Sequence, residues 1–272
     1  MEKETLRKVQ LVMLEILEEV KRVCDEHGIK YFLICGTCLG AIRHQGFIPW
    51  DDDLDIGMLR EDYDKFCRIA PTALDPKYYL QEWKTDKDCA IPFAKVRKRG
   101  TIYQEAKTKP GANNGIFIDV KVHDNTPEDA LWIPHRRKLY LMERLVLMKC
   151  GYRPWQEDDK ILWKKRVLYL PIQMLSWLVS KDKLVNKFEK QVKSIAGNTE
   201  KVNIHSGGMD CGVFLREYFN ETVDMPFEGK MFPVPARYHE YLTTYYGDYM
   251  QLPPEDKREN RHQIQLLDFG KE

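Results

Sequence analysis

Four aspartates fall within residues 51–55 of this chain. Carboxylates at this density repel one another unless a hard divalent cation binds them. From Asp53 onward acidic and apolar residues alternate. This period of two predicts a strand in which Asp53 and Asp55 share one face while Leu54 and Ile56 point to the core. The chain must therefore fold so that one strand delivers a pair of carboxylates to the same place.

Length and composition allow a full hydrophobic core. The chain has 272 residues, of which 43% are hydrophobic, so we expect one large domain or one domain with a helical insert. The formal net charge is +1, from 43 basic and 42 acidic side chains. No global field therefore favours nucleic acid, and we expect no nucleic-acid partner.

The seven cysteines are scattered and odd in number, and only Cys35 and Cys38 have a paired spacing. The first residues, Met-Glu-Lys-Glu, lack the apolar core of a signal peptide. We therefore expect a reducing, cytoplasmic setting. The Gly-Thr between the two cysteines fits a phosphate-binding turn better than a redox motif. A zinc site would need a second closely spaced Cys/His pair, which the sequence lacks.

Hydrophobic periodicity predicts a mixed α+β fold, a sheet flanked by helices. We expect a first helix over 6–24 and, after residue 36, a short helix ending at 43. Further helices are expected at 60–69, throughout 128–197 and at 238–246, and a turn at 107–114. Strands are predicted at 31–35, 54–58, 78–83, 93–98, 101–105 and 116–122, with a hairpin at 227–235. These elements suggest a catalytic core (1–127), a helical insert or cap (128–200) and a segment completing the core (201–272).

A third carboxylate should join Asp53 and Asp55. Asp119 is the best candidate, because it is the lone aspartate among alternating aliphatic residues of a predicted strand. Two or three carboxylates can hold Mg²⁺ against the bridging phosphates of a nucleoside diphosphate. Asp119 is then either a ligand or a general base. Asp51 could also be a ligand, whereas Asp52 should point away and cap the loop.

Several residues could contact such a phosphate donor. Gly36 allows a close backbone approach, and Thr37 at a helix start offers a hydroxyl and an N–H. Arg43 lies within reach on the same helix, or is simply solvated. Lys95 shares one strand face with Arg97 and Arg99, as a cationic site or as ordinary surface. Trp50 could stack on a base or on a quaternary ammonium, or belong to the core. These candidates are Gly36, Thr37, Arg43, Trp50, Lys95, Arg97 and Arg99.

The longest apolar stretch, 167–179, has 13 residues and contains Pro171. It is shorter than the roughly 20 residues of a membrane-spanning helix. Its flanks are basic, and Trp163 and Trp177 lie near its ends. This composition fits either a buried core helix with solvated ends or an interfacial helix that makes weak contact with an anionic membrane.

Together, these motifs closely resemble the signature of the LicD family of phosphotransferases. The long match comprises GTCLGAIRH at 36–44, GFIPWDDDLDIGM at 46–58 and REDY at 60–63. Shorter matches near the C-terminus are FEG at 227–229, PVP at 233–235, YL at 241–242, YGDY at 246–249 and LPP at 252–254. The resemblance touches both ends of the chain and leaves the helical region between them unassigned.

The resemblance implies a nucleotidyltransferase-like fold and Mg²⁺- or Mn²⁺-dependent transfer of phosphocholine from CDP-choline to a sugar of a cell-envelope glycan such as teichoic acid or lipopolysaccharide. It makes Asp51, Asp53 and Asp55 metal and phosphate residues and matches Asp119 to a later family aspartate. The family run after that aspartate is aromatic-Pro-aliphatic-Asp, whereas residues 121–124 here are Lys-Val-His-Asp. The expected partners are a CDP-alcohol and a glycan or glycolipid, in the cytoplasm or at the inner membrane face. The alternatives are a nucleotidyltransferase that moves NMP and an inactive glycan-binding or scaffold protein.

Overall fold

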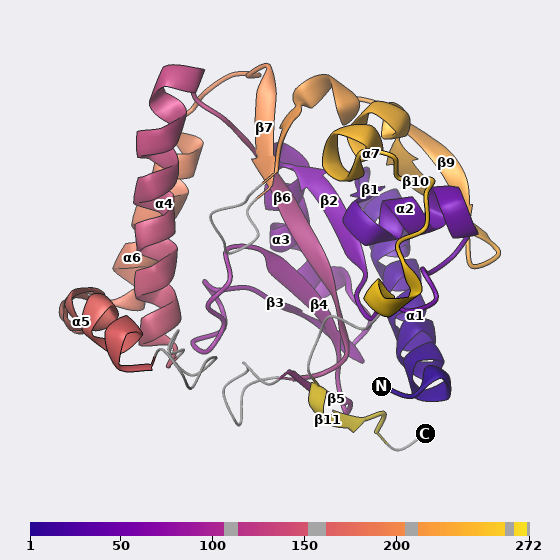
Figure 1. The fold of residues 1–272 in the computed structure, drawn as a ribbon, viewed down its shortest axis with the longest axis horizontal. Helices are drawn as coiled ribbons and strands as arrows, with labels where there is room; N and C mark the ends of the chain where they lie inside the picture. The colour runs from indigo at the N-terminus through magenta and orange to yellow at the C-terminus, as the bar shows by residue number, and fades with distance from the viewer. Residues whose placement is uncertain (106–113, 152–161, 205–211, 259–263, 271–272) are drawn as a thin grey trace.

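The computed structural model describes residues 1–105, 114–151, 162–204, 212–258 and 264–270, with 162–166 described by their backbone. Helices and strands alternate along the chain, and three helices stand beside the sheet as a separate group (Figure 1). The predicted α+β class is confirmed. Among the described helices, none is both long and apolar enough to cross a membrane.

In the described part of the chain, the main sheet has seven strands. They are β1 (Phe32–Leu33), β2 (Asp55–Leu59), β3 (Tyr78–Gln81), β4 (Ala94–Lys98), β6 (Phe117–Asn125), β7 (Lys201–Ile204) and β8 (Val213–Leu215). Strand β6 is central: it pairs in parallel with β2 and antiparallel with β4 and β7. Strands β1, β3 and β8 extend the sheet antiparallel to β2, β4 and β7. The sheet is therefore mixed, as predicted.

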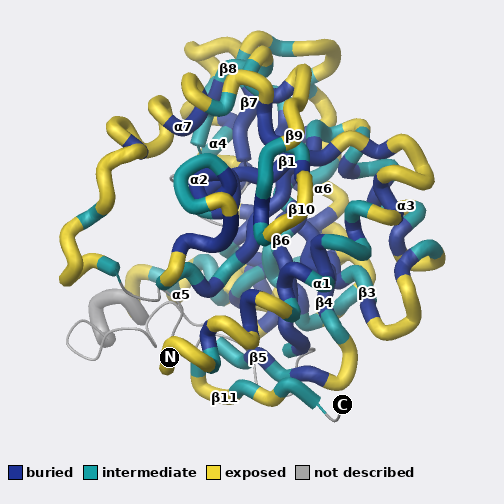
Figure 2. The backbone as a smooth tube through the Cα atoms, turned by 90° about the vertical axis from the view of Figure 1, so that its right-hand side faces the viewer, coloured by how far each residue is buried: buried dark blue, intermediate teal, exposed yellow. Residues whose placement is uncertain are grey.

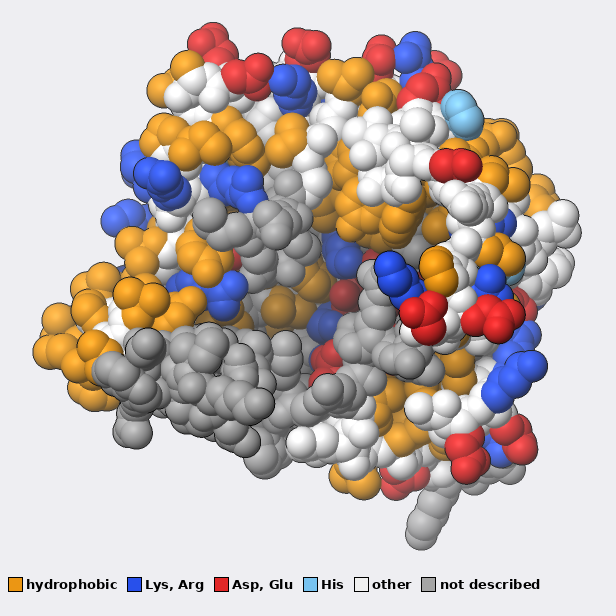
Figure 3. All heavy atoms as spheres, viewed as in Figure 1, with side chains coloured by type: hydrophobic (Ala, Val, Ile, Leu, Met, Phe, Trp, Pro, Cys, Tyr) orange, Lys and Arg blue, Asp and Glu red, His pale blue; other side chains and the backbone are white. Residues whose placement is uncertain are grey.

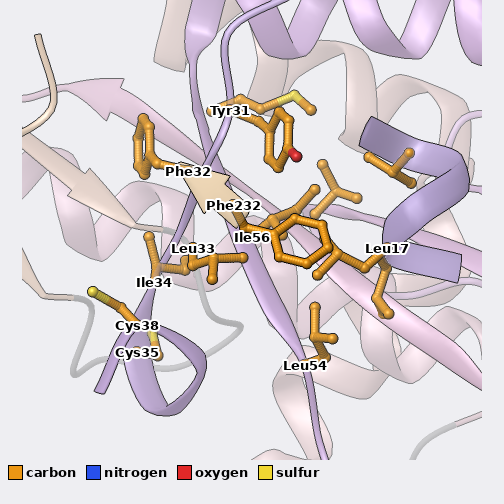
Figure 4. Close-up of a cluster of buried hydrophobic side chains, with 14 of the residues drawn as sticks. Leu17, Tyr31, Phe32, Leu33, Ile34, Cys35, Cys38, Leu54, Ile56 and Phe232 are labelled. Atoms are coloured by element: carbon orange, nitrogen blue, oxygen red, sulfur yellow. The ribbon is translucent and has the colours of Figure 1, made fainter. Parts of the chain in front are cut away.

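Helices α1 (Lys3–His27) and α3 (Arg60–Ala73) cover one face of this sheet. Figure 4 shows Leu17 of α1 in one cluster with Leu54 and Ile56, which are 1% and 0% exposed. The prediction that these two residues point to the core is confirmed. Since successive strand residues point to opposite faces, Asp55 lies on the other face. Figure 2 shows the central strands buried and the outer helices partly exposed.

The remaining core elements lie around the start of β2, where Asp55 is located. They are α2 (Cys35–His44), α7 (Tyr238–Tyr246), the β9–β10 hairpin (Thr222–Phe227 and Lys230–Pro235), a second two-stranded sheet of β5 (Ile102–Glu105) and β11 (Ile264–Asp268), and short 3₁₀ turns at Arg216–Tyr218 and Glu255–Lys257. Several boundaries differ from prediction, and strands β7, β8 and β11 were not predicted. The strand expected at 31–35 stops at Leu33, because Cys35 has a left-handed φ of 49° and already begins α2. The hairpin begins at Thr222, earlier than predicted. Of the predicted turn at 107–114, only residue 114 lies within the described residues.

The described residues between 129 and 193 are mostly helical, as predicted, and have their own hydrophobic cluster. Helices α4 (Asp129–Lys149), α5 (Leu162–Leu178) and α6 (Lys181–Lys193) pack together. Trp83, from the segment after β3, joins this cluster with its ring centroid 4.7 Å from that of Phe188. The insert thus has a hydrophobic core distinct from that of the sheet, and Trp83 packs into this core from the segment after β3.

Candidate active site

A row of charged side chains crosses the face of the sheet opposite α1 and α3. Asp55 of β2 lies in register with Asp119 of β6, and Asp119 lies in register with Lys95 of β4. Residues opposite one another in adjacent strands point to the same face, so the sheet itself aligns these three side chains. Lys121 shares their face because it follows Asp119 by two residues. We call Asp55, Asp119, Lys95 and Lys121 the carboxylate–lysine row.

Each carboxylate of the row is paired with one lysine. The Nζ of Lys121 lies 2.7 Å from Oδ1 of Asp55, and the Nζ of Lys95 lies 2.8 Å from Oδ1 of Asp119. Burial, together with the charges of Asp53 and Asp119, raises the pKa of Asp55 to about 6 despite Lys121. Burial lowers the pKa of Lys121, but Asp55 more than compensates, so that pKa lies well above its usual value. Lys121 alone therefore does not neutralise the local negative charge.

Asp51 has its pKa raised further than Asp55. Burial, followed by the charge of Asp53 and a hydrogen bond to its carboxylate, raises the pKa of Asp51 to about 9. Gly36 borders this carboxyl, since a Cβ at Gly36 would lie 2.5 Å from Oδ2 of Asp51. Only glycine fits here without displacing Asp51. The structure thus places Asp51 beside Gly36 and Asp53, and Asp55 beside Asp119.

Helix α2 is fixed to the row through Thr37. Its Oγ1 accepts a hydrogen bond of 2.8 Å from the backbone N–H of Asp55, and Thr37 is buried. The backbone N–H of Cys35 donates to the Tyr241 hydroxyl at 3.0 Å. Thr37 therefore positions the carboxylate strand in this structure, in addition to the phosphate contact that the sequence suggested.

The two cysteines of α2 are buried free thiols. Burial raises the pKa of Cys35 to about 12 and raises the pKa of Cys38 as well. A reactive cysteine needs an accessible thiolate. Their environment agrees with the expectation that this pair is not a redox motif.

Arg43 and Trp50 contact the C-terminal segment. The Nη1 of Arg43 donates to the backbone oxygens of Tyr249 and Gln251, at 2.7 and 3.3 Å. The guanidinium of Arg258 lies 5.4 Å from the centre of the Trp50 ring. In this structure both residues anchor the C-terminal segment.

Of the three basic residues predicted near β4, Lys95 alone joins the row. Arg97 is buried and donates to Oε1 of Gln81 at 2.6 Å and to the oxygen of Gly115 at 2.7 Å. Arg99 donates to the oxygen of Pro76 at 3.1 Å. Arg97 and Arg99 therefore stabilise neighbouring segments and do not extend the cationic site.

Sequence reasoning missed Lys121 and a pair of tyrosines on α7. The signal for Lys121 was present, because the period of two puts it beside Asp119. Tyr245 and Tyr246 are 44% and 37% exposed, and their ring centroids lie 4.6 Å apart at 90°. Cys35 and burial raise the pKa of Tyr245 to about 12, and burial followed by the charge of Cys35 raises the pKa of Tyr246. The two rings thus form an aromatic corner on α7, which packs against α2, and periodicity alone did not indicate this contact.

Carboxylate oxygens are the kind of ligand that a hard divalent cation such as Mg²⁺ binds. In this structure Lys95 pairs with one carboxylate oxygen of Asp119, and Lys121 pairs with one carboxylate oxygen of Asp55. Within the described ranges, no three His, Cys, Asp or Glu side chains are arranged to hold a metal ion. A cation would therefore compete with the two lysines for the carboxylates.

Figure 3 shows charged side chains of both signs at the bottom of a hollow near the centre of one face. A cavity of about 360 Å³ lies between α4, β7, β8 and α7. Its lining includes Trp132, Lys201, Phe214 and Thr244. The Phe214 ring lies 5.7 Å from that of Tyr245, so this cavity adjoins the aromatic corner. A larger cavity of about 440 Å³, between α3 and β3, contains none of the carboxylates of the row.

Comparison with known proteins adds independent evidence. The domain model described as LicD/FKTN/FKRP, nucleotidyltransferase domain, matches residues 28–157. The lipopolysaccharide cholinephosphotransferase LicD of Haemophilus influenzae is 33% identical over 269 residues, which cover 96% of this chain and 97% of that protein. The ribitol 5-phosphate transferase FKRP of Mus musculus is 43% identical over 144 residues, 49% of this chain and 26% of FKRP. The residues matched by the domain model include the aspartates of 51–55 and Asp119.

Proposed function

This chain belongs to the LicD family, and on that premise we propose that it transfers phosphocholine, or a similar phospho-alcohol, from a CDP-activated donor to a sugar hydroxyl of a cell-envelope glycan. Two relatives support the reaction class, since their names state transfer of cholinephosphate to lipopolysaccharide and of ribitol 5-phosphate. The observation that carries the proposal is the carboxylate–lysine row, because it sets acidic and cationic groups together where a diphosphate needs both.

We propose that Asp51, Asp53, Asp55 and Asp119 hold Mg²⁺, or Mn²⁺ in its place. The cation would neutralise charge on the bridging phosphates of the donor. Lys95 and Lys121, freed from the carboxylates, would then bind phosphate oxygens. The N-terminus of α2 at Gly36 and Thr37 would add backbone N–H donors for the same phosphates.

The transfer itself needs no covalent enzyme intermediate. The acceptor hydroxyl oxygen forms a bond to the phosphorus that carries the alcohol, and the bond from that phosphorus to the CMP oxygen breaks. CMP leaves with the bonding electron pair. Asp119 would accept the hydroxyl proton if it faces the acceptor, since its strand places it at the centre of the row.

The aromatic corner suggests which alcohol is preferred. Two tyrosine rings at right angles suit a quaternary ammonium, which binds aromatic faces by cation–π attraction. We therefore assign choline recognition to Tyr245 and Tyr246, in place of Trp50. Tyr245→Leu should raise KM for CDP-choline more than KM for CDP-ribitol, whereas Trp50→Leu should change both alike.

The adjoining cavity of about 360 Å³ is our candidate for the acceptor sugar. Trp132 offers an aromatic wall, while Lys201 and Thr244 offer polar contacts. Trp132→Ala should raise KM for the glycan and leave KM for the donor unchanged. A rise in donor KM alone would place the acceptor elsewhere.

The decisive experiment incubates the protein and Mg²⁺ with CDP-choline, CDP-ethanolamine, CDP-ribitol or CDP-glycerol, with and without candidate glycans. We expect CMP release that depends on the glycan and is fastest with CDP-choline. Donor labelled separately in choline and in cytidine distinguishes the alternatives. Cytidine label in the glycan would establish NMP transfer, and glycan binding without turnover of any donor would indicate an inactive binding protein.

A further inference from the structure

Helix α5 exposes an apolar face to solvent. Its exposed described residues, which we call the outer face of α5, are all apolar: Val167, Leu168, Leu170, Pro171, Met174, Leu175, Trp177 and Leu178. Three of them are more than two-thirds exposed, with Leu168 at 72%, Trp177 at 68% and Leu178 at 83%. The expectation of a buried core helix is therefore wrong for this segment. Figure 3 shows these hydrophobic side chains gathered over α5 at the lower left.

Two polar residues of the helix, Gln173 and Ser176, lie on its packed side. Ser176 is 1% exposed, and its backbone oxygen accepts a hydrogen bond of 2.8 Å from the Nζ of Lys149 on α4. Ile172 packs against the hydrophobic cluster of the insert, and Gln173 is half-buried. An ordinary surface helix has the opposite arrangement, with its apolar stripe inside and its polar residues outside. Contiguous exposed apolar surface of this kind marks an interaction site.

The sequence around this face is mostly basic. Residues 160–181 contain five basic residues and no acidic residue. Lys149 at the end of α4 and Lys183 at the start of α6 are exposed, and one exposed acidic residue, Asp182, lies beside Lys183. Apolar side chains combined with tryptophan and flanking lysines match the composition of helices that lie in the interface of anionic bilayers.

We propose that the outer face of α5 docks the protein on an anionic lipid bilayer, with the helix lying in the interface. A second copy of the chain is a poorer occupant, because a symmetric contact would bring two sets of cations together. Anionic headgroups would instead neutralise them. This inference does not rest on the proposed function, since it concerns a surface remote from the carboxylate–lysine row.

Vesicle flotation tests the proposal with the full chain and no donor. One set of vesicles contains phosphatidylglycerol and phosphatidylcholine, and the other contains phosphatidylcholine alone. We expect the protein to float with the anionic vesicles only and to be released as salt increases. Leu168→Ser/Trp177→Ser/Leu178→Ser should lower the bound fraction at least tenfold. Because all three side chains are exposed, this variant should keep the thermal midpoint of the wild type.

A control variant removes exposed apolar groups elsewhere. Met231 and Met250 are 51% and 56% exposed, and Met231→Ser/Met250→Ser should float like the wild type. Absence of flotation, equal flotation with both vesicle types, or undiminished flotation of the α5 variant would overturn the proposal. The proposal would also be overturned if the wild type sedimented as a dimer and the α5 variant as a monomer. Turnover with a soluble glycan, measured on the same variant, should be unchanged, which separates this test from that of the proposed function.

Discussion

The carboxylate–lysine row and the outer face of α5 depart from ordinary burial in opposite directions. In the row, Asp55 and Lys95 are buried although both are ionisable. On α5, large apolar side chains such as Trp177 and Leu178 are exposed. Ionisable residues are mostly exposed in folded proteins, and contiguous apolar patches are seldom exposed without an interaction. Both departures indicate binding, one of a polar ligand in a hollow and the other of an apolar surface.

The two regions also differ in what holds them in place. The row lies on the central strands β2, β6 and β4, so main-chain pairing on both sides fixes the positions of its side chains. Helix α5 is attached through its packed side, to α4 and to the separate core of the insert. A site for chemistry needs a rigid frame, whereas a docking face needs accessible area. Variants can test whether the two regions are energetically separate in this way.

The largest effect is expected at the carboxylates of the site. Asp53→Asn and Asp55→Asn should each lower turnover by roughly a thousandfold or more, because a cation held by carboxylates contributes several kcal/mol to catalysis. CMP release measures the loss, and thermal melting should show that both variants stay folded. Activity within tenfold of wild type would contradict the assignment. Asp119→Asn should lower turnover by a similar factor. If this variant only needs more Mg²⁺ to reach the wild-type rate, Asp119 is a metal ligand and not the general base.

The comparison also predicts unequal stability effects within the insert. Phe188→Ala should lower the free energy of unfolding by about 3–5 kcal/mol, because the side chain is 1% exposed in the insert core. Leu178→Ala should change it by less than about 0.5 kcal/mol, since that side chain is mostly exposed. Urea denaturation followed by circular dichroism measures both. A large loss at Leu178 would mean that the outer face of α5 is covered within the chain itself.

An intermediate effect is expected at Lys121. Lys121→Met should raise KM for the donor roughly 10- to 100-fold, through loss of a charged hydrogen bond to phosphate. Lys193→Met is a matched control, because Lys193 also pairs with an aspartate, at 2.6 Å from Asp64, but on α6 and outside the row. Steady-state kinetics with varied donor distinguishes the two. Equal kinetic changes in both variants would argue for a general charge effect.

The smallest effect is expected at the two cysteines of α2. Cys35→Ser and Cys38→Ser should each leave turnover within a few-fold of wild type, because buried thiols of raised pKa are unreactive. Small packing losses should lower the thermal midpoint slightly. Loss of activity in both variants, together with activation of the wild type by dithiols, would restore the redox interpretation.

The alternation of residues along the strands predicted which face of the sheet carries Asp55 and Asp119. The alternation around Leu54 and Ile56 placed Asp55 on the face away from the core, and the lone aspartate of a second alternating strand identified Asp119. Both follow from the period of two, which depends only on local backbone geometry. The same rule would have identified Lys121. It could not predict that Arg97 turns to Gln81 and Gly115, because those partners come from other parts of the chain.

The sequence by itself determined the α+β class, the pair of carboxylates and the family, because these depend on local periodicity and on a long, specific motif. The tertiary structure alone decided that two lysines pair with the carboxylates of the row, that the rings of Tyr245 and Tyr246 meet at a right angle, and that α5 turns its apolar side chains outward. Periodicity shows which residues share a face of a helix or strand. Which element covers that face depends on long-range packing, and a run such as 167–179 looks the same in sequence whether it is covered or exposed.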